Sequence, residues 1–209
     1  MNWRKGTFQP KQPRADITRN QILEAALMLF SQNGYHGTDT KRIAAAANVA
    51  TGSVYRYFKD KKTIFLSVCE YLETKMQTAI FKTADEIMAQ SSAPEEGIGL
   101  FIRFTMDVHR ENRSFHREVL AMSVQDDDVA ALVKAREDRV RMRLLDFFQS
   151  LGNVISVTDL EAAAELVYFT VEEVAHQAVI FQSEVGEKRL IEQLAEMLSR
   201  YLLKKTGCF

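Results

Sequence analysis

The chain has 209 residues, 46% of them hydrophobic, which is enough for one large core and a smaller second one. No apolar run approaches the ~20 residues that a membrane-spanning helix needs, and the basic N-terminus lacks the apolar segment of a secretion signal. The two cysteines, Cys69 and Cys208, are far apart and lack metal-ligand spacing. We therefore expect a cytoplasmic protein with reduced thiols and no contact with a membrane.

The formal net charge of −1 conceals a strong segregation of charge along the chain. Residues 1–62 hold 11 Lys and Arg against 4 Asp and Glu, a net charge of +7, and the remainder has 16 against 24, a net charge of −8. A basic N-terminal part of this size suits a polyanionic partner. The acidic remainder argues against a chain that coats nucleic acid along its whole length.

Residues 1–16 are predicted to form a flexible basic arm, because prolines and a glycine precede any periodic apolar pattern. Such an arm could reach into a DNA minor groove, and an ordinary disordered tail fits the same residues equally well. The basic residues considered for this role are Arg4, Lys5, Lys11 and Arg14.

After the arm, apolar residues recur at helical spacing almost throughout, which predicts an all-α chain. A first helix is expected to begin at Thr18, with Gln21 completing a capping box, and to end at Gly34. This helix opens a predicted domain at 17–62, and a larger helical domain follows at 63–209. Further helices are expected near 60–90, 95–110, 114–123, 126–151, 158–182 and 187–205.

The stretch 38–58 predicts two short helices joined by a tight turn. Thr38 or Asp39 can cap the first helix, and Asn48 can adopt a left-handed backbone at the turn. Such a helix-turn-helix places its second helix in a DNA major groove. That second helix exposes three side chains in succession: Tyr55, Arg56 and Tyr57.

Together with its flanks, over about residues 18–66, this stretch resembles the N-terminal domain of TetR-family repressors. The strongest match is the run 52–58 followed by Lys61, which is similar to the family pattern Gly-x-Leu-Tyr-x-Tyr-Phe-x-x-Lys. Asn48 stands where the family usually has Gly, and Lys62-Thr63 replaces a usual acidic pair. Both departures are compatible with the fold.

The resemblance implies that Tyr55 and Lys61 contact phosphates, that Tyr57 lies near the DNA backbone or a base edge, and that Phe58 fills the core. Arg56 occupies a position from which it can read a guanine, and a solvated surface arginine is the alternative. The full set of expected DNA contacts is Thr40, Lys41, Thr51, Gly52, Ser53, Tyr55, Arg56, Tyr57 and Lys61.

The C-terminal region shows no catalytic triad spacing, phosphate-binding loop or metal-ligand cluster, so neither an enzyme nor a cofactor is expected. His109 and His116 are seven residues apart, and the polar residues 112–114 between them predict a helix break. We therefore favour solvated or hydrogen-bonded histidines over a metal site for this pair.

Aromatic and methionine side chains are dense in the same region, and most of them are expected to be ordinary core. His176 lies among apolar residues and needs a polar partner from the core, a dimer mate or a ligand. The resemblance implies a helix-lined cavity for a small-molecule inducer. The candidate ligand-binding residues are Phe104, Val108, Met122, Phe147, Tyr168, Glu172 and His176.

The segments 158–182 and 187–205 carry wide apolar stripes, more than one chain should need. Pairing both with their symmetry mates would form a four-helix interface and present two recognition helices to half-sites about 34–36 Å apart. The alternative is that both stripes pack inside one subunit. The predicted interface residues are Val167, Val171, Ala175, Leu190, Leu194, Met197, Leu198 and Tyr201.

These features predict a ligand-responsive transcriptional regulator, and a repressor in particular. It would bind a palindromic double-stranded DNA operator as a homodimer and leave it when an unidentified small-molecule effector binds. One alternative is a DNA-binding regulator without an inducer, whose C-terminal domain docks a protein partner. Another is an enzyme with an incidental helix-turn-helix, which the missing catalytic residues disfavour.

Overall fold

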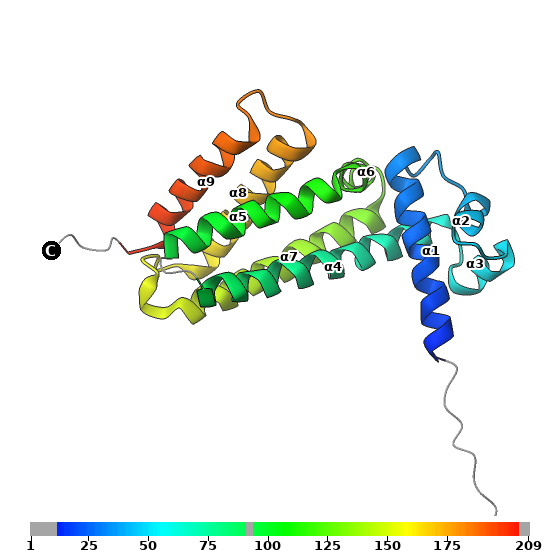
Figure 1. Ribbon diagram of the computed structural model, residues 1–209, viewed down its shortest axis with the longest axis horizontal. Coiled ribbons are helices and arrows are strands. Elements are labelled where there is room, and N and C mark those ends of the chain that lie inside the picture. Colours follow the sequence, from blue (N-terminus) through cyan, green and yellow to red (C-terminus); the bar gives the residue numbers. More distant parts are fainter. Residues whose placement is uncertain (1–11, 91–93, 205–209) are drawn as a thin grey trace, which may run out of the picture. The chain divides into compact units, whose positions relative to one another are not determined.

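The computed structural model describes residues 12–90 and 94–204 of the chain (Figure 1). Across these residues the regular structure is helical, apart from an isolated bridge between Ile155 and Leu203. The predicted all-α class is thereby confirmed. The helices are α1 Gln12–Asn33, α2 Thr40–Ala46, α3 Thr51–Tyr57, α4 Lys61–Gln90, α5 Pro94–Glu111, α6 Arg113–Ser123, α7 Asp127–Leu151, α8 Leu160–Ala175 and α9 Glu187–Leu202.

The chain folds as two compact units, Met1–Tyr71 and Leu72–Phe209. The boundary lies later than the expected position after residue 62, because the first turns of α4 belong to the core of the N-terminal unit. Ile64, Phe65 and Val68 are fully buried. The ring of Phe65 packs edge-on against Phe30 of α1 with 5.2 Å between centroids. The N-terminal unit is therefore built from α1 to α3 and the beginning of α4.

Helix α1 begins earlier than the sequence predicts. It starts at Gln12, so Thr18 lies inside the helix and the expected capping box does not mark its start. Residues 12–16, expected in the arm, belong to this helix, whose buried face includes Ile22 and Leu23. The arm residues Arg4, Lys5 and Lys11 lie outside the described residues.

The C-terminal unit is a bundle in which α5 packs against α9 and α7 packs against α8. Figure 1 shows α9 alongside α8 and α5. The segment expected as one helix over 158–182 is α8 followed by a π-helical turn, His176–Ile180. Asp159 caps α8 by accepting a hydrogen bond from the Ala162 amide, 3.0 Å. In the part of the chain that the structure describes, no helix is long and apolar enough to cross a membrane.

Candidate nucleic-acid interface and effector site

The start of α2 is fixed by Asp39, whose carboxylate accepts hydrogen bonds from the amides of Lys41 and Arg42, both 2.9 Å. The Arg42 amide bond is the main cause that lowers the pKa of the Asp39 carboxyl. Thr38, the other candidate cap, is buried instead, with its hydroxyl 2.9 Å from the carbonyl oxygen of Gly34. Of the two predicted caps, the structure selects Asp39.

The turn between α2 and α3 depends on Asn48, which has a φ of +53°. The predicted left-handed conformation is thereby confirmed. The amides of Asn48 and Val49 donate to the carbonyls of Ala45 and Ala44, at 3.1 and 3.0 Å. These bonds satisfy carbonyl groups at the end of α2 and direct the chain into α3.

Helix α3 has one buried face and one exposed face. Val54 and Phe58 are buried in the core, so the predicted role of Phe58 is confirmed. Gly52, Tyr55 and Arg56 are exposed, with Tyr55 at 53%. A Cβ atom at Gly52 would meet nothing within 4 Å, so this surface is open to a partner. An exposed face of this kind on a second short helix has the form that enters a major groove.

Two side-chain contacts hold polar residues on the exposed face of α3. The hydroxyls of Thr40 and Tyr55 lie 2.9 Å apart and share a hydrogen bond that joins the start of α2 to α3. The guanidinium carbon of Arg56 lies 5.9 Å from the centre of the Tyr57 ring. Lys41 is exposed, and Thr51, Ser53 and Tyr57 are half-buried. Direct DNA contact by these residues stays a prediction.

Lys61 has an intramolecular role that sequence reasoning missed. Its ammonium donates to the carbonyl oxygens of Tyr35 and Thr38, at 2.8 and 2.9 Å. It also lies 4.3 Å from the centre of the Tyr35 ring. The side chain thus ties the start of α4 to the loop before α2. The expected phosphate contact of Lys61 stays a prediction.

The C-terminal unit contains a mostly apolar cavity of about 280 Å³, partly open to solvent, between α5, α7, α8 and α9. Its walls include Ile98, Phe101, Phe148, Val167 and Leu198. Phe147, one of the residues predicted to bind a ligand, also lines it. The other candidates do not line this cavity, because helix rotation turns them toward other parts of the unit: Phe104, Val108, Met122, Tyr168, Glu172 and His176.

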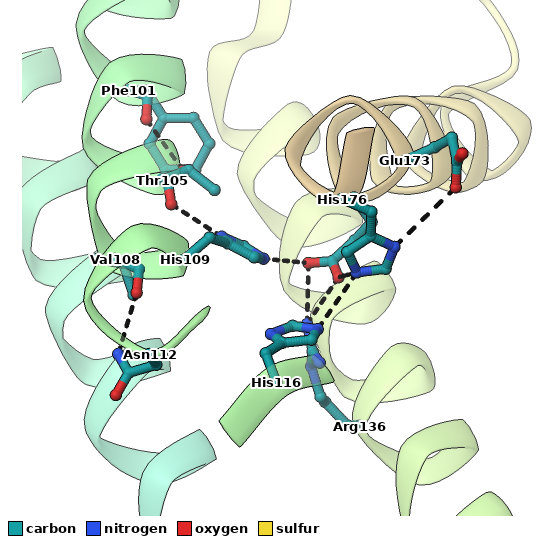
Figure 2. Close-up of polar contacts among 10 residues, drawn as sticks. Phe101, Thr105, Val108, His109, Asn112, His116, Arg136, Glu173 and His176 are labelled. Carbon is teal, nitrogen blue, oxygen red and sulfur yellow. Dashed lines mark hydrogen bonds and ion pairs between the residues drawn. The ribbon is translucent and has the colours of Figure 1, made fainter. Parts of the chain in front are cut away.

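Glu172 and His176 belong to a separate polar cluster, which Figure 2 shows together with His109, His116 and Arg136. One terminal nitrogen of Arg136 lies 2.9 Å from both carboxylate oxygens of Glu172. His109 and His116, expected to be separated by a helix break, stand with ring centroids 5.2 Å apart. The break does occur, between α5 and α6, and it folds α6 back so that the rings meet.

The burial of this cluster determines its protonation. Burial, reinforced by the positive charge of Arg136, lowers the pKa of His116 to about 3. Burial also lowers the pKa of His176. Burial alone would raise the pKa of Glu172, but the positive charge of Arg136 brings it well below the ordinary range. At neutral pH the cluster therefore holds an ionised Glu172 with neutral His116 and His176.

Most of the residues predicted for the dimer interface, in α8 and in α9, are buried inside their own subunit. Five of its residues lie in the core of their own subunit, because their helix faces pack against α5 and α7 and against each other: Val167, Val171, Ala175, Leu194 and Leu198. Leu190 is half-buried, and Met197 and Tyr201 remain exposed, at 48% and 38%. Leu166 and Phe169 of α8, which were not among the predicted interface residues, are also exposed, at 55% and 45%.

The short helix pair with its exposed second helix defines a helix-turn-helix protein, joined to a helical C-terminal unit. The family model "Bacterial regulatory proteins, tetR family" matches residues 22–68. The model "Tetracyclin repressor-like, C-terminal domain" matches residues 94–202, which is more than half of the chain. The chain therefore belongs to the TetR family of DNA-binding transcriptional regulators.

Individual relatives agree with this assignment. Over 76 residues the chain is 36% identical to the fatty acid metabolism regulator protein of Bacillus subtilis, covering 36% of this chain and 38% of that protein. Over 62 residues it is 44% identical to the transcriptional regulator AcrR of Shigella flexneri, covering 30% of this chain and 29% of that one. The chain thus covers well under half the length of these two relatives.

Solved structures show the same fold at low sequence identity. A TetR-family regulator from Mesorhizobium loti superposes with a TM-score of 0.79 and 20% identity, covering 92% of this chain and all of that one. A transcriptional regulator from Saccharomonospora viridis in complex with choline has a TM-score of 0.71 and 17% identity, covering 91% of this chain and all of that one.

Proposed function

We propose that the protein is a repressor that binds a palindromic operator as a homodimer and is released by a small molecule bound in its C-terminal unit. The observation that carries the proposal is the exposed face of α3 around Tyr55 and Arg56, held by the Asp39 cap and the Asn48 turn. The charge of residues 1–62, +7, supplies the attraction to phosphates. Family members bind DNA through this unit, which supports the assignment.

The cavity between α5, α7, α8 and α9 is the proposed effector site. Its walls are mostly apolar, with Arg143 and Asp146 among the lining residues. These walls suit a molecule with an apolar body and a polar end. A regulator of the same fold holds choline, and one relative is named for fatty acid metabolism. The choline complex supports a small-molecule effector.

The proposal is tested by DNA binding of the full chain, with duplexes selected from a random pool. Arg56→Ala is expected to weaken binding of the selected duplex by roughly 1–3 kcal/mol and to change binding of a scrambled duplex much less. The reason is that a base contact is lost, whereas the phosphate contacts remain. Fluorescence anisotropy at several salt concentrations measures both affinities.

Arg103→Ala is the matched control, because Arg103 is an exposed arginine on α5 of the other unit. It should leave both affinities unchanged. If Arg56→Ala and the unaltered protein bind the selected duplex with equal affinity, Arg56 and its face of α3 do not take part in base recognition. A chain that selects no duplex at all would contradict the proposed function itself.

A further inference from the structure

Four potential metal ligands lie in the polar cluster, and three of them form a mutually close group. They come from separate elements: His109 from α5, His116 from α6, Glu172 from α8 and His176 from the π-helical turn. One ligand atom each of His109, His116 and Glu172 lie within 4.8 Å of one another. Figure 2 shows the three imidazole rings directed toward one centre.

Three separations within the cluster are close to those of a tetrahedral metal site. The Nε2 atoms of His116 and His176 are 3.2 Å apart, and His176 Nε2 is 3.6 Å from an oxygen of Glu172. His109 Nε2 is 3.4 Å from the other oxygen of Glu172. Ligands at about 2.0–2.1 Å from a tetrahedral ion lie about 3.3 Å from each other. These three separations are therefore close to the spacing that a bound ion would impose, and His176 lies beside the group formed by His109, His116 and Glu172.

His109 carries an unsatisfied nitrogen at this centre. Its Nδ1 lies 2.8 Å from the carbonyl oxygen of Thr105, which can only accept, so Nδ1 carries the proton. In the neutral imidazole, the lone pair of Nε2 then faces the carboxylate of Glu172, 3.4 Å away. Nε2 has no hydrogen-bond partner although the side chain is 1% exposed. A buried Nε2 facing a carboxylate is costly unless the nitrogen gains a proton or a cation lies between the two groups.

We propose that His109, His116, His176 and Glu172 bind one divalent transition-metal cation of the zinc class. Three imidazoles and one carboxylate suit Zn²⁺, Co²⁺, Ni²⁺ or Cu²⁺, whereas Mg²⁺ and Ca²⁺ prefer oxygen ligands. The site is separate from the apolar cavity, whose walls contain none of these four residues.

Two neighbouring groups orient the ligands. The Thr105 carbonyl sets the tautomer of His109, as a second-sphere acceptor does in metal proteins. Arg136 holds both oxygens of Glu172 and fixes the plane of its carboxylate. The carboxylate of Glu73 also acts on Arg136 and offsets part of its charge. The π-helical turn that begins at His176 is a rare feature that often occurs at functional sites.

The test uses the untagged full chain, stripped with a chelator and then given Zn²⁺ or Co²⁺. We expect one bound metal per chain by elemental analysis, and the intense visible absorption of four-coordinate cobalt. His116→Ala should lower zinc affinity by at least roughly 100-fold, since loss of a second-sphere partner alone costs 10–100-fold. His36→Ala, at an exposed histidine of the N-terminal unit, is the matched control and should retain full affinity.

If circular dichroism shows that His116→Ala does not fold, a second variant that replaces one metal ligand by another still tests the proposal. His176→Cys should bind cobalt and add a sulfur-to-cobalt charge-transfer band that the unaltered protein lacks. The proposal is overturned if the unaltered chain leaves cobalt with the spectrum of the six-coordinate aqueous ion. It is also overturned if zinc binds equally well to the unaltered chain and to folded His116→Ala, or if the His176→Cys spectrum shows no sulfur band.

Discussion

Asn48 is the residue of the helix-turn-helix whose backbone is left-handed. Its φ of +53° is a region that side chains with a Cβ avoid, and Asn tolerates it better than most residues. The hydrogen bond from the Val49 amide to the Ala44 carbonyl depends on this angle, because Val49 follows Asn48 in the chain. Sequence reasoning could find the position because turn chemistry is local to a few residues.

We predict that Asn48→Ala lowers the free energy of unfolding by about 1 kcal/mol, because Ala pays more than Asn for a left-handed backbone. Asn48→Gly should change it by a few tenths of a kcal/mol at most, or raise it. Urea unfolding followed by circular dichroism measures both values. Ala45→Gly, at an exposed site inside α2, is the control and should be destabilising. A neutral Asn48→Ala would mean that the turn carries no backbone strain.

The contacts of Lys61, unlike the turn at Asn48, could not be predicted from neighbouring residues. The family pattern marks the residue, but its partners, the carbonyls of Tyr35 and Thr38, are 26 and 23 positions away. No local rule places a lysine on those carbonyls. Its contacts follow from how α1, α2 and α4 close around the core of the N-terminal unit.

At the scale of elements, the end of α5 and the two last helices show where periodicity is insufficient. The break near Asn112 is visible in the sequence, but the direction in which α6 leaves is not, and that direction brings His116 to His109. In α8 and α9 the apolar stripe covers more than one face. The inward face packs within the subunit. The exposed apolar residues that remain, here called the outward stripe, are Leu166, Phe169, Met197 and Tyr201.

We predict that the outward stripe forms the homodimer contact. Leu166→Glu combined with Met197→Glu should give a folded monomer, because two charges would be buried without partners at a symmetric interface. Analytical ultracentrifugation at micromolar concentration measures the mass. Met142→Glu, at a methionine of α7 that is 67% exposed, is the control and should remain dimeric. A dimeric double variant would place the interface elsewhere.

At the scale of the whole molecule, release from DNA requires that effector and operator binding be coupled. Thermodynamic linkage makes this coupling reciprocal, so an effector that weakens operator binding is itself bound more weakly when the operator is present. The coupling needs a ligand in the C-terminal unit that distinguishes two states of the dimer. The apolar cavity is the place where we expect such a ligand to bind.

We predict that Ile98→Trp fills this cavity and lowers binding of the apolar dye N-phenyl-1-naphthylamine by at least tenfold, while operator affinity stays within a factor of about two. Dye fluorescence and anisotropy of labelled operator measure the two affinities. Val124→Trp, at a side chain that is 87% exposed and outside the cavity, is the control and should bind dye normally. Unchanged dye binding by Ile98→Trp would show that this cavity is not the apolar site.

The sequence by itself determined the all-α class, most helix boundaries and the faces of α3, except that Tyr57, expected to be exposed, is half-buried. It could do so because helical periodicity, the Asp39 cap and the Asn48 turn act over a few neighbouring residues. Only the tertiary structure decided that Val171 and Leu194 face inward, and that three histidines surround Glu172. Those outcomes depend on how helices rotate and cross, which is set by packing between residues far apart in the chain.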